Sequence, residues 1–141
     1  MKITSDEFIR WMVEVGGRRP QEEAWAVYVD TQLVIRHVKC IAKGTLDAVV
    51  MHPRDVFRHA IAMNAYGFII VHNHPSGRLV FSQMDLEVLR KLAVCAAIVQ
   101  IHLFDFLVVS ADGYISAFER KMVPEIQWQN LLDLWTKHVN L

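Results

Sequence analysis

The spacing of hydrophobic residues changes several times along this chain, and each change marks the boundary of an expected strand or helix. A period of two is typical of half-buried strands, whereas apolar residues three and four positions apart are typical of amphipathic helices. These patterns predict strands over residues 22–30, 33–41, 46–51, 68–74, 100–110 and 114–118. They predict helices over residues 5–15, 52–64, 82–97 and about 124–139.

Residues at the boundaries support several of these elements. Ser5 can cap the first helix, and Gly16-Gly17 ends it. Asp30-Thr31-Gln32 is a turn between the first two strands, which predicts a hairpin. Pro53 suits the first turn of the second helix. Asp112-Gly113 predicts the turn between the last two strands.

Composition narrows the class of protein. The chain has 141 residues, of which 53% are hydrophobic, and its formal net charge is zero. This length predicts one domain, residues 1–141, while the neutral charge disfavours a basic nucleic-acid surface or a polybasic membrane anchor. The longest apolar run, residues 92–99, is too short to span a bilayer, and we expect no secretory signal. Cys40 and Cys95 lack zinc-ligand spacing, so we expect both to pack as small hydrophobic residues in a cytoplasmic protein.

The strongest chemical signal is a pair of histidines, His72 and His74, directly after the apolar run of residues 68–71. Side chains two apart on a strand point to the same face, so a strand that reaches His74 presents both imidazoles together. Asp85 follows at the head of the next helix, and two imidazoles with one carboxylate leave a fourth position open, as in catalytic zinc sites. Alternatively, the histidines form a surface or packed pair, and Asp85 is a first-turn carboxylate stabilised by the helix dipole.

The residues next to the histidines have structural interpretations. Asn73 and Ser76 are expected to be structural, and Pro75 is expected to end the strand. Gly77 is expected to supply a backbone turn that other residues resist. The loop over residues 76–80 is expected to be exposed.

The downstream spacing extends the histidine pair to the string His72-x-His74-Pro75-x6-Ser82-x2-Asp85. This string closely resembles the JAMM signature of the JAB/MPN metalloprotease superfamily, and HNHPSG preceded by MHPRDVF resembles the RadC family. The resemblance covers roughly residues 20–118. It implies a three-layer α/β/α sandwich with a mixed central β-sheet, a cytidine-deaminase-like architecture, and a Zn²⁺ site at His72, His74 and Asp85.

The resemblance also implies two catalytic residues. In the family, a glutamate that opens a strand, eight residues before an aspartate at its end, is the general base and then the general acid. Glu22 and Asp30 have this spacing, so the resemblance selects Glu22 rather than Glu23. Ser82 matches the serine that stabilises the oxyanion. Both roles have simpler alternatives, since the two glutamates could be solvated residues at a strand entrance and Ser82 could act only as a helix cap.

Several positions depart from the family pattern. Phe81 stands where a proline is common, Leu89 where a threonine is usual, and Phe106 where a histidine often follows Asp105. These departures concern the substrate groove and not the metal ligands. RadC chains usually carry a helical, DNA-binding-like region ahead of the catalytic domain. Only the helix over 5–15 precedes the match here, so we expect this chain to lack that region.

The sequence therefore predicts a zinc-dependent hydrolase that cleaves peptide or isopeptide bonds of a protein or peptide substrate. The alternative is a non-catalytic scaffold or binding module in DNA repair or recombination, although neutral charge argues against direct DNA binding. A zinc deaminase requires a His-x-Glu and a Pro-Cys-x-x-Cys, and the chain has neither. No membrane partner is expected, and no pattern specifies an oligomeric state.

Overall fold

The computed structural model describes residues 1–44 and 51–138, with side chains described as far as residue 133. Its strands are β1 (Glu23–Val29), β2 (Ile35–Lys43), β3 (Gly67–Asn73), β4 (His102–Ser110) and β5 (Gly113–Ser116). Its helices are α1 (Asp6–Trp11), the π-helical η1 (Met12–Gly16), α2 (Pro53–Ala62), α3 (Gln83–Val99) and α4 (Trp128–His138). Within the described ranges, no helix has both the length and the apolar character needed to cross a membrane.

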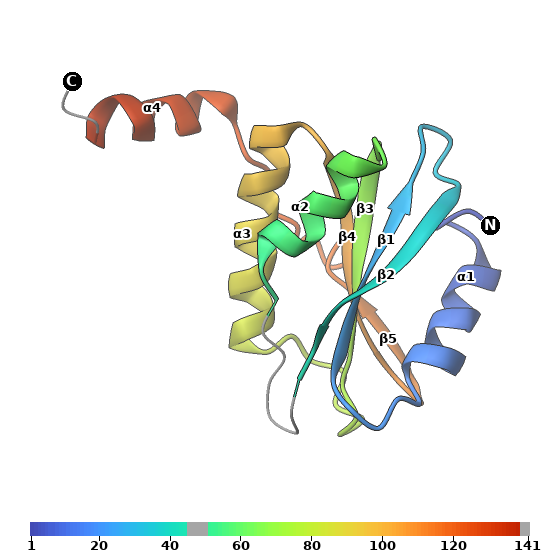
Figure 1. Cartoon of the computed structure of the whole chain (residues 1–141). Coiled ribbons are helices and arrows are strands. Elements are labelled where there is room, and N and C mark those ends of the chain that lie inside the picture. The colour runs from blue at the N-terminus through green and yellow to red at the C-terminus, as the bar shows by residue number, and fades with distance from the viewer. Residues whose placement is uncertain (45–50, 139–141) are drawn as a thin grey trace.

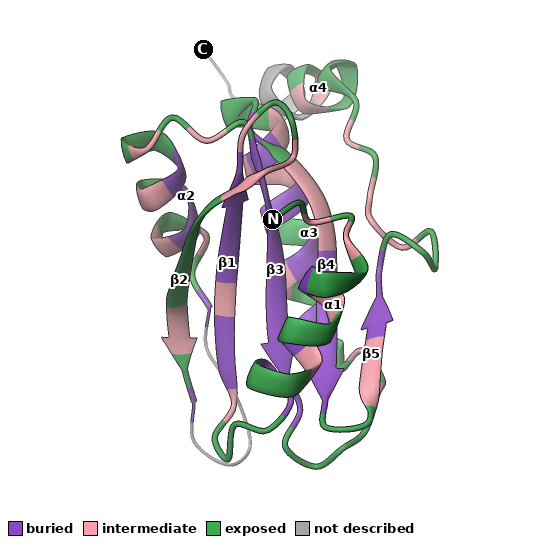
Figure 2. Cartoon of the chain, turned by 90° about the vertical axis from the view of Figure 1, so that its right-hand side faces the viewer, coloured by how far each residue is buried: buried purple, intermediate pink, exposed green. Residues whose placement is uncertain are grey.

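The five strands form one mixed sheet in the order β2-β1-β3-β4-β5 (Figure 1). β1 is antiparallel to both β2 and β3, β3 is parallel to β4, and β4 is antiparallel to β5. The predicted hairpins β1–β2 and β4–β5 are therefore confirmed. Burial follows this order, because the central strands β1 and β3 are almost wholly buried whereas the edge strand β2 is largely exposed (Figure 2).

Helices cover both faces of the sheet and produce the predicted three layers (Figure 1). On one face α2 and α3 pack on the sheet through residues such as Phe57 and Leu92, against strand residues including Ile70. On the other face Phe8 and Met12 of α1 and η1 pack on residues of β1, β3 and β4. The alternation predicted for β1 is confirmed, because successive residues of the strand enter the two cores in turn.

The structure corrects three details of the predictions and leaves a fourth untested. The last helix begins at Trp128 rather than at residue 124, because the carbonyl of Gln127 is the first to accept bonds from the amides of the following turn. The second helix ends at Ala62, since Asn64 adopts a positive φ of 53°. Cys40 is exposed rather than packed, because it lies on the edge strand. The strand expected over residues 46–51 falls almost entirely outside the described residues.

Candidate metal centre

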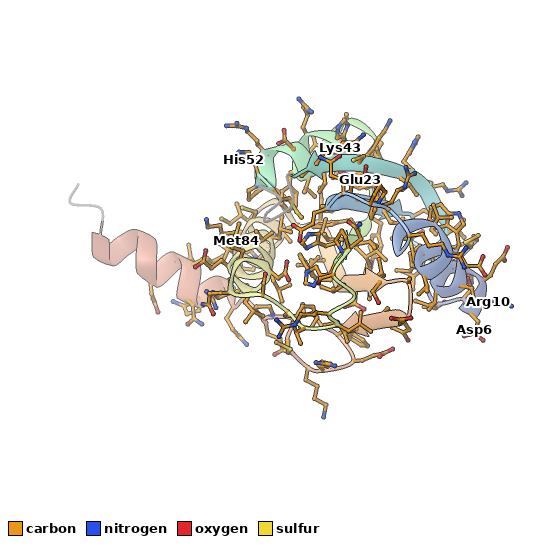
Figure 3. The ribbon with its side chains drawn as sticks, turned by 90° about the horizontal axis from the view of Figure 1, so that it is seen from below. Asp6, Arg10, Glu23, Lys43, His52 and Met84 are labelled. Carbon is orange, nitrogen blue, oxygen red and sulfur yellow. The ribbon has the colours of Figure 1, made fainter. Side chains whose placement is uncertain are left out.

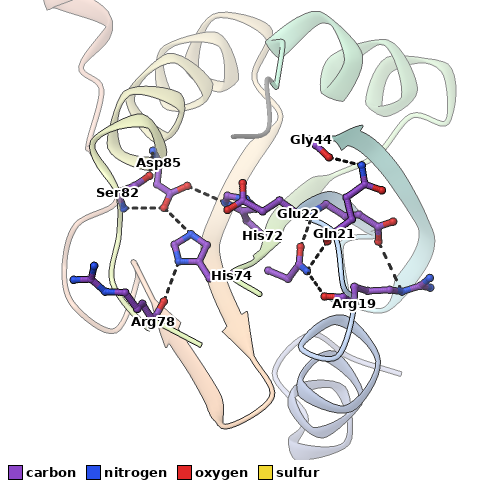
Figure 4. A network of polar contacts seen from close by, with 11 residues as sticks. Arg19, Gln21, Glu22, Gly44, His72, His74, Arg78, Ser82 and Asp85 are labelled. Carbon is purple, nitrogen blue, oxygen red and sulfur yellow. Dashed lines mark hydrogen bonds and ion pairs between the residues drawn. The ribbon is translucent and has the colours of Figure 1, made fainter. Parts of the chain in front are cut away.

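The candidate metal centre forms where the end of β3 meets the start of α3. His72 belongs to β3, and the backbone N–H of His74 still donates to the carbonyl of Val109 at 2.9 Å. This bond carries the extended backbone one residue past the strand, so the two imidazoles lie on the same side of the sheet. Asp85 occupies the first turn of α3 and faces both of them (Figure 4).

The three predicted ligands lie in direct contact. Nδ1 of His72 is 2.9 Å from Oδ1 of Asp85, and Nε2 of His74 is 3.2 Å from Oδ2 of the same carboxylate. The candidate ligand atoms all lie within 4.8 Å of one another, and all three residues are buried. The two imidazole rings are 4.9 Å apart and nearly perpendicular, so that they approach Asp85 from different directions.

Two features of this cluster fit a metal ion. Among the described residues, Nε2 of His72 is the one buried side-chain nitrogen or oxygen that has no hydrogen-bond partner. Buried polar atoms normally find a partner, so an unpaired lone pair here needs an explanation, and a cation supplies one. His74 is oriented as metal-binding histidines are, because its Nδ1–H donates to the carbonyl of Arg78 at 2.9 Å and Nε2 faces Asp85, where a metal ion would take the place of the Nε2 proton.

The electrostatics of the cluster favour an ionised Asp85 carboxylate and raise the pKa of the His74 imidazole. Burial raises the pKa of Asp85, but hydrogen bonds from His72, His74 and the Ser82 amide outweigh that effect and hold the pKa well below its usual range. The hydrogen bond to Asp85 raises the pKa of His74, and the Arg78 carbonyl raises it further. Asp85 is therefore charged at neutral pH, as a metal ligand must be.

The two adjacent glutamates point to different surroundings. Oε2 of Glu22 lies 3.8 Å from Nε2 of His72, on the side of the sheet that holds the cluster (Figure 4). Glu23 is buried elsewhere, with its carboxylate 3.7 Å from both Arg19 and Lys43 (Figure 3). The structure thus brings the predicted residue, Glu22, to the cluster and engages its neighbour in ion pairs.

Ser82 caps α3 through a reciprocal pair of bonds with Asp85. The amide of Asp85 donates to Oγ of Ser82 at 3.0 Å, and the amide of Ser82 donates to Oδ2 of Asp85 at 2.8 Å. This capping box fixes the carboxylate relative to the helix start. Because Oγ only accepts in this pair, its hydroxyl proton stays available to a ligand in the adjacent cavity.

All five predicted site residues line one cavity of about 460 Å³. Its other walls are largely apolar, with contributions from Met51, Val80, Met84, Val88 and Phe106. Met84 and Val80 line the cavity and are about half exposed, so its apolar wall reaches solvent. A cavity of this size, with a few convergent polar groups in an apolar wall, is typical of a ligand site.

Sequence reasoning missed two contributions to this centre. The Arg78 carbonyl orients His74, and main-chain contacts of this kind carry no sequence signal. Asn73 was expected to be structural, in agreement with its burial, but the sequence did not indicate that its side chain binds the backbone of the segment that carries Glu22. The alternation of the strand would have placed Asn73 on the face opposite the histidines, although not its partners, which are about fifty residues away in sequence.

Comparisons with known proteins agree with this geometry. The model of the RadC-like JAB domain family matches residues 3–122. A UPF0758 protein of Geobacillus sp. (strain WCH70) is 40% identical over 103 residues, which are 73% of this chain and 46% of the relative. The UPF0758 protein YsxA of Bacillus subtilis (strain 168) is 37% identical over 100 residues, 71% and 43% of the two chains. This chain therefore spans about half the length of the curated relatives it matches.

Proposed function

The chain belongs to the RadC-like JAB domain family, and from that premise we propose that it is a zinc-dependent hydrolase of peptide or isopeptide bonds. The observation that carries the proposal is the buried group of His72, His74 and Asp85, with an unpaired nitrogen on His72. Two imidazoles and one carboxylate are a donor set that zinc prefers, with one position left for water or substrate.

Beside the three metal ligands, Glu22 and Ser82 each have one chemical task in this proposal. A bound zinc ion supplies an activated water at neutral pH and a Lewis acid for the scissile carbonyl. Glu22, whose carboxylate lies 3.8 Å from Nε2 of His72, accepts a proton from the water and returns it to the leaving nitrogen. Ser82 donates its hydroxyl proton to the oxygen on which negative charge develops.

A peptide substrate suits the cavity better than a nucleic acid does. Apolar side chains such as Met84 and Val80 stand beside the cluster, where they can contact apolar groups of a peptide. The alternative of a scaffold or binding module in DNA repair lacks an electrostatic basis, because the chain has zero formal net charge. The free thiols of Cys40 and Cys95 suit a reducing compartment, and we propose the cytoplasm.

The experiment that tests the proposal measures metal content and hydrolysis on the same preparation. Purified protein is analysed by elemental mass spectrometry and then incubated with a complex pool of peptides in ¹⁸O-labelled water. We expect about one zinc ion per chain and new peptide carboxyl groups that contain ¹⁸O. Protein stripped with a chelator should produce none, and zinc should restore the products. Full zinc occupancy without ¹⁸O incorporation into any peptide would overturn the hydrolase and leave a metal-binding module.

A further inference from the structure

Asn73 lies between the two candidate ligand histidines in the sequence but faces the other side of the sheet. It is the last residue of β3, and its exposed fraction is 0%. His72 and His74 face α3, so strand alternation directs the Asn73 side chain away from them. Asn73 does not line the cavity that holds the cluster. It therefore touches neither the metal position nor the space for substrate.

The Asn73 carboxamide uses its hydrogen-bonding groups on a single short segment, residues 19–23. Its Oδ1 accepts from the backbone N–H of Glu23 at 2.6 Å. Its Nδ2 donates to the carbonyl of Gln21 at 2.9 Å and to the carbonyl of Arg19 at 3.3 Å. A buried amide has two hydrogens to donate and an oxygen to accept, so here each has a backbone partner.

These bonds take over where the strand ladder stops. The last residue pair between β1 and β3 is Ala24 with His72, one residue before Asn73. Beyond that pair, the Asn73 side chain replaces main-chain bonds and holds the segment on both sides of Glu22. From the opposite edge, the amide of Gly44 donates to the Glu22 carbonyl at 2.9 Å. The segment is thus fixed from two directions, and the Glu22 carboxylate lies 3.8 Å from His72 as a result.

We propose that Asn73 is a positioning residue, which fixes Glu22 beside the metal ligands from the back of the sheet. One residue between two ligands thereby couples the strand that binds metal to the segment that carries the acid–base group. The effect on hydrolysis rests on the proposed function. The effect on the position of residue 22 does not, so the two can be tested separately.

The first test uses zinc affinity and needs no substrate. Glu22→His places a further imidazole where the carboxylate now approaches His72, and it should raise zinc affinity, measured by competition with a chelating dye, about tenfold. Asn73→Asp keeps the side-chain volume and the acceptor for Glu23 but turns an oxygen toward two carbonyls. In the Asn73→Asp background, Glu22→His should no longer raise zinc affinity. The Asn73→Ala background should give the same result.

A matched control removes a different buried polar group at the same end of the sheet. Ser110 is buried, and its hydroxyl accepts from the amide of Asp112, which lies outside residues 19–23. In a Ser110→Ala background, the gain from Glu22→His should remain about tenfold. Thermal unfolding of each variant shows which are folded, and Asn73→Asp carries the test if Asn73→Ala does not fold.

The outcomes separate this inference from the proposed function. An equal gain in the wild-type and Asn73→Asp backgrounds overturns the positioning role, and so does the absence of any gain in the wild-type background. If the wild type hydrolyses peptides, Asn73→Asp should retain its zinc and lower kcat about 100-fold with KM nearly unchanged, because the misplaced group acts only on the chemical step. An unchanged kcat also overturns the role. If the wild type hydrolyses nothing, the proposed function fails while the affinity test still decides the role of Asn73.

Discussion

Asp85 and Asp105 are two carboxylates on opposite faces of the sheet, and each has three hydrogen-bonding neighbours. Asp85, which is 4% exposed, is met by two imidazoles and the amide of Ser82. Asp105 lies on the face covered by α1, where it accepts from the hydroxyl of Ser116 at 2.5 Å and from two backbone amides. The number of partners is equal, but their chemistry differs.

The difference in partners reverses the electrostatic outcome. Burial raises the pKa of Asp105, and its hydroxyl and amide donors do not offset that effect. Burial also acts on Asp85, but the hydrogen bonds of His72 and His74 overcome it and lower the pKa. Imidazoles can donate to a carboxylate or turn a lone pair to a cation, whereas backbone amides only donate. A half-buried carboxylate alone therefore does not mark a metal site, and the imidazoles beside it do.

The largest difference between the two carboxylates should appear in metal binding. Asp85→Ala removes one of three ligands, so zinc affinity should fall more than about 100-fold, beyond the effect of losing an outer partner. Asp105→Ala should retain about one zinc ion per chain, because its hydrogen-bond partners among the described residues are a hydroxyl and backbone amides and include no imidazole. Elemental analysis and chelator competition measure both variants. Loss of zinc from Asp105→Ala alone would reverse the assignment.

The second comparison sets Glu22 against its neighbour Glu23. Glu22→Gln should keep its zinc, because Glu22 is not among the three ligands, and should lower the hydrolysis rate by about 10²- to 10⁴-fold. Glu23→Gln should hydrolyse at nearly the wild-type rate, since that carboxylate is engaged by Arg19 and Lys43. Initial rates on one cleaved peptide, with zinc content measured in parallel, distinguish the two. Equal losses in both variants would argue against a specific role for Glu22.

Local rules predicted where the three candidate ligands lie, whereas the choice of a metal site over a packed pair came from the family resemblance. Strand alternation placed His72 and His74 on one face, and capping chemistry placed Asp85 at the start of α3. Glu22 needed the family resemblance, because its approach to His72 joins segments fifty residues apart and alternation agreed only weakly. The exposure of Cys40 depends on which strand forms the sheet edge, and the order of strands is not encoded in a local pattern.

Ser82 combines a structural and a proposed catalytic task, and a second serine cap separates them. Ser82→Ala removes the cap of α3, which should cost about 1 kcal/mol of unfolding free energy. It should also lower hydrolysis about 10²- to 10³-fold if the hydroxyl stabilises the oxyanion. Ser5 caps α1 through the Phe8 amide and lies outside the cavity, so Ser5→Ala should show only the stability loss. Similar hydrolysis by the two variants would restrict Ser82 to capping.

The smallest expected effect concerns how the ionisation of Asp105 makes the free energy of unfolding depend on pH. Its pKa in the folded chain lies above the unfolded value of about 3.9. Between these two pKa values the folded state binds more protons, so the free energy of unfolding falls as pH rises through that interval. Asp105→Asn does not titrate, and its amide can donate to Ser116 while its oxygen keeps the backbone donors. The variant should therefore gain stability relative to wild type as pH rises above about 4.

Urea unfolding of wild type and Asp105→Asn across this pH range measures that gain directly, and the titrations of the metal cluster cancel because both proteins share them. A stability difference that does not change with pH would show that Asp105 titrates normally in the fold. In that case hydroxyl and amide donors would be sufficient to compensate for burial, as the imidazoles do at Asp85. The two carboxylates would then no longer differ in the direction of their pKa shifts. Only the histidine lone pairs beside Asp85, which can bind a metal ion, would distinguish the two sites.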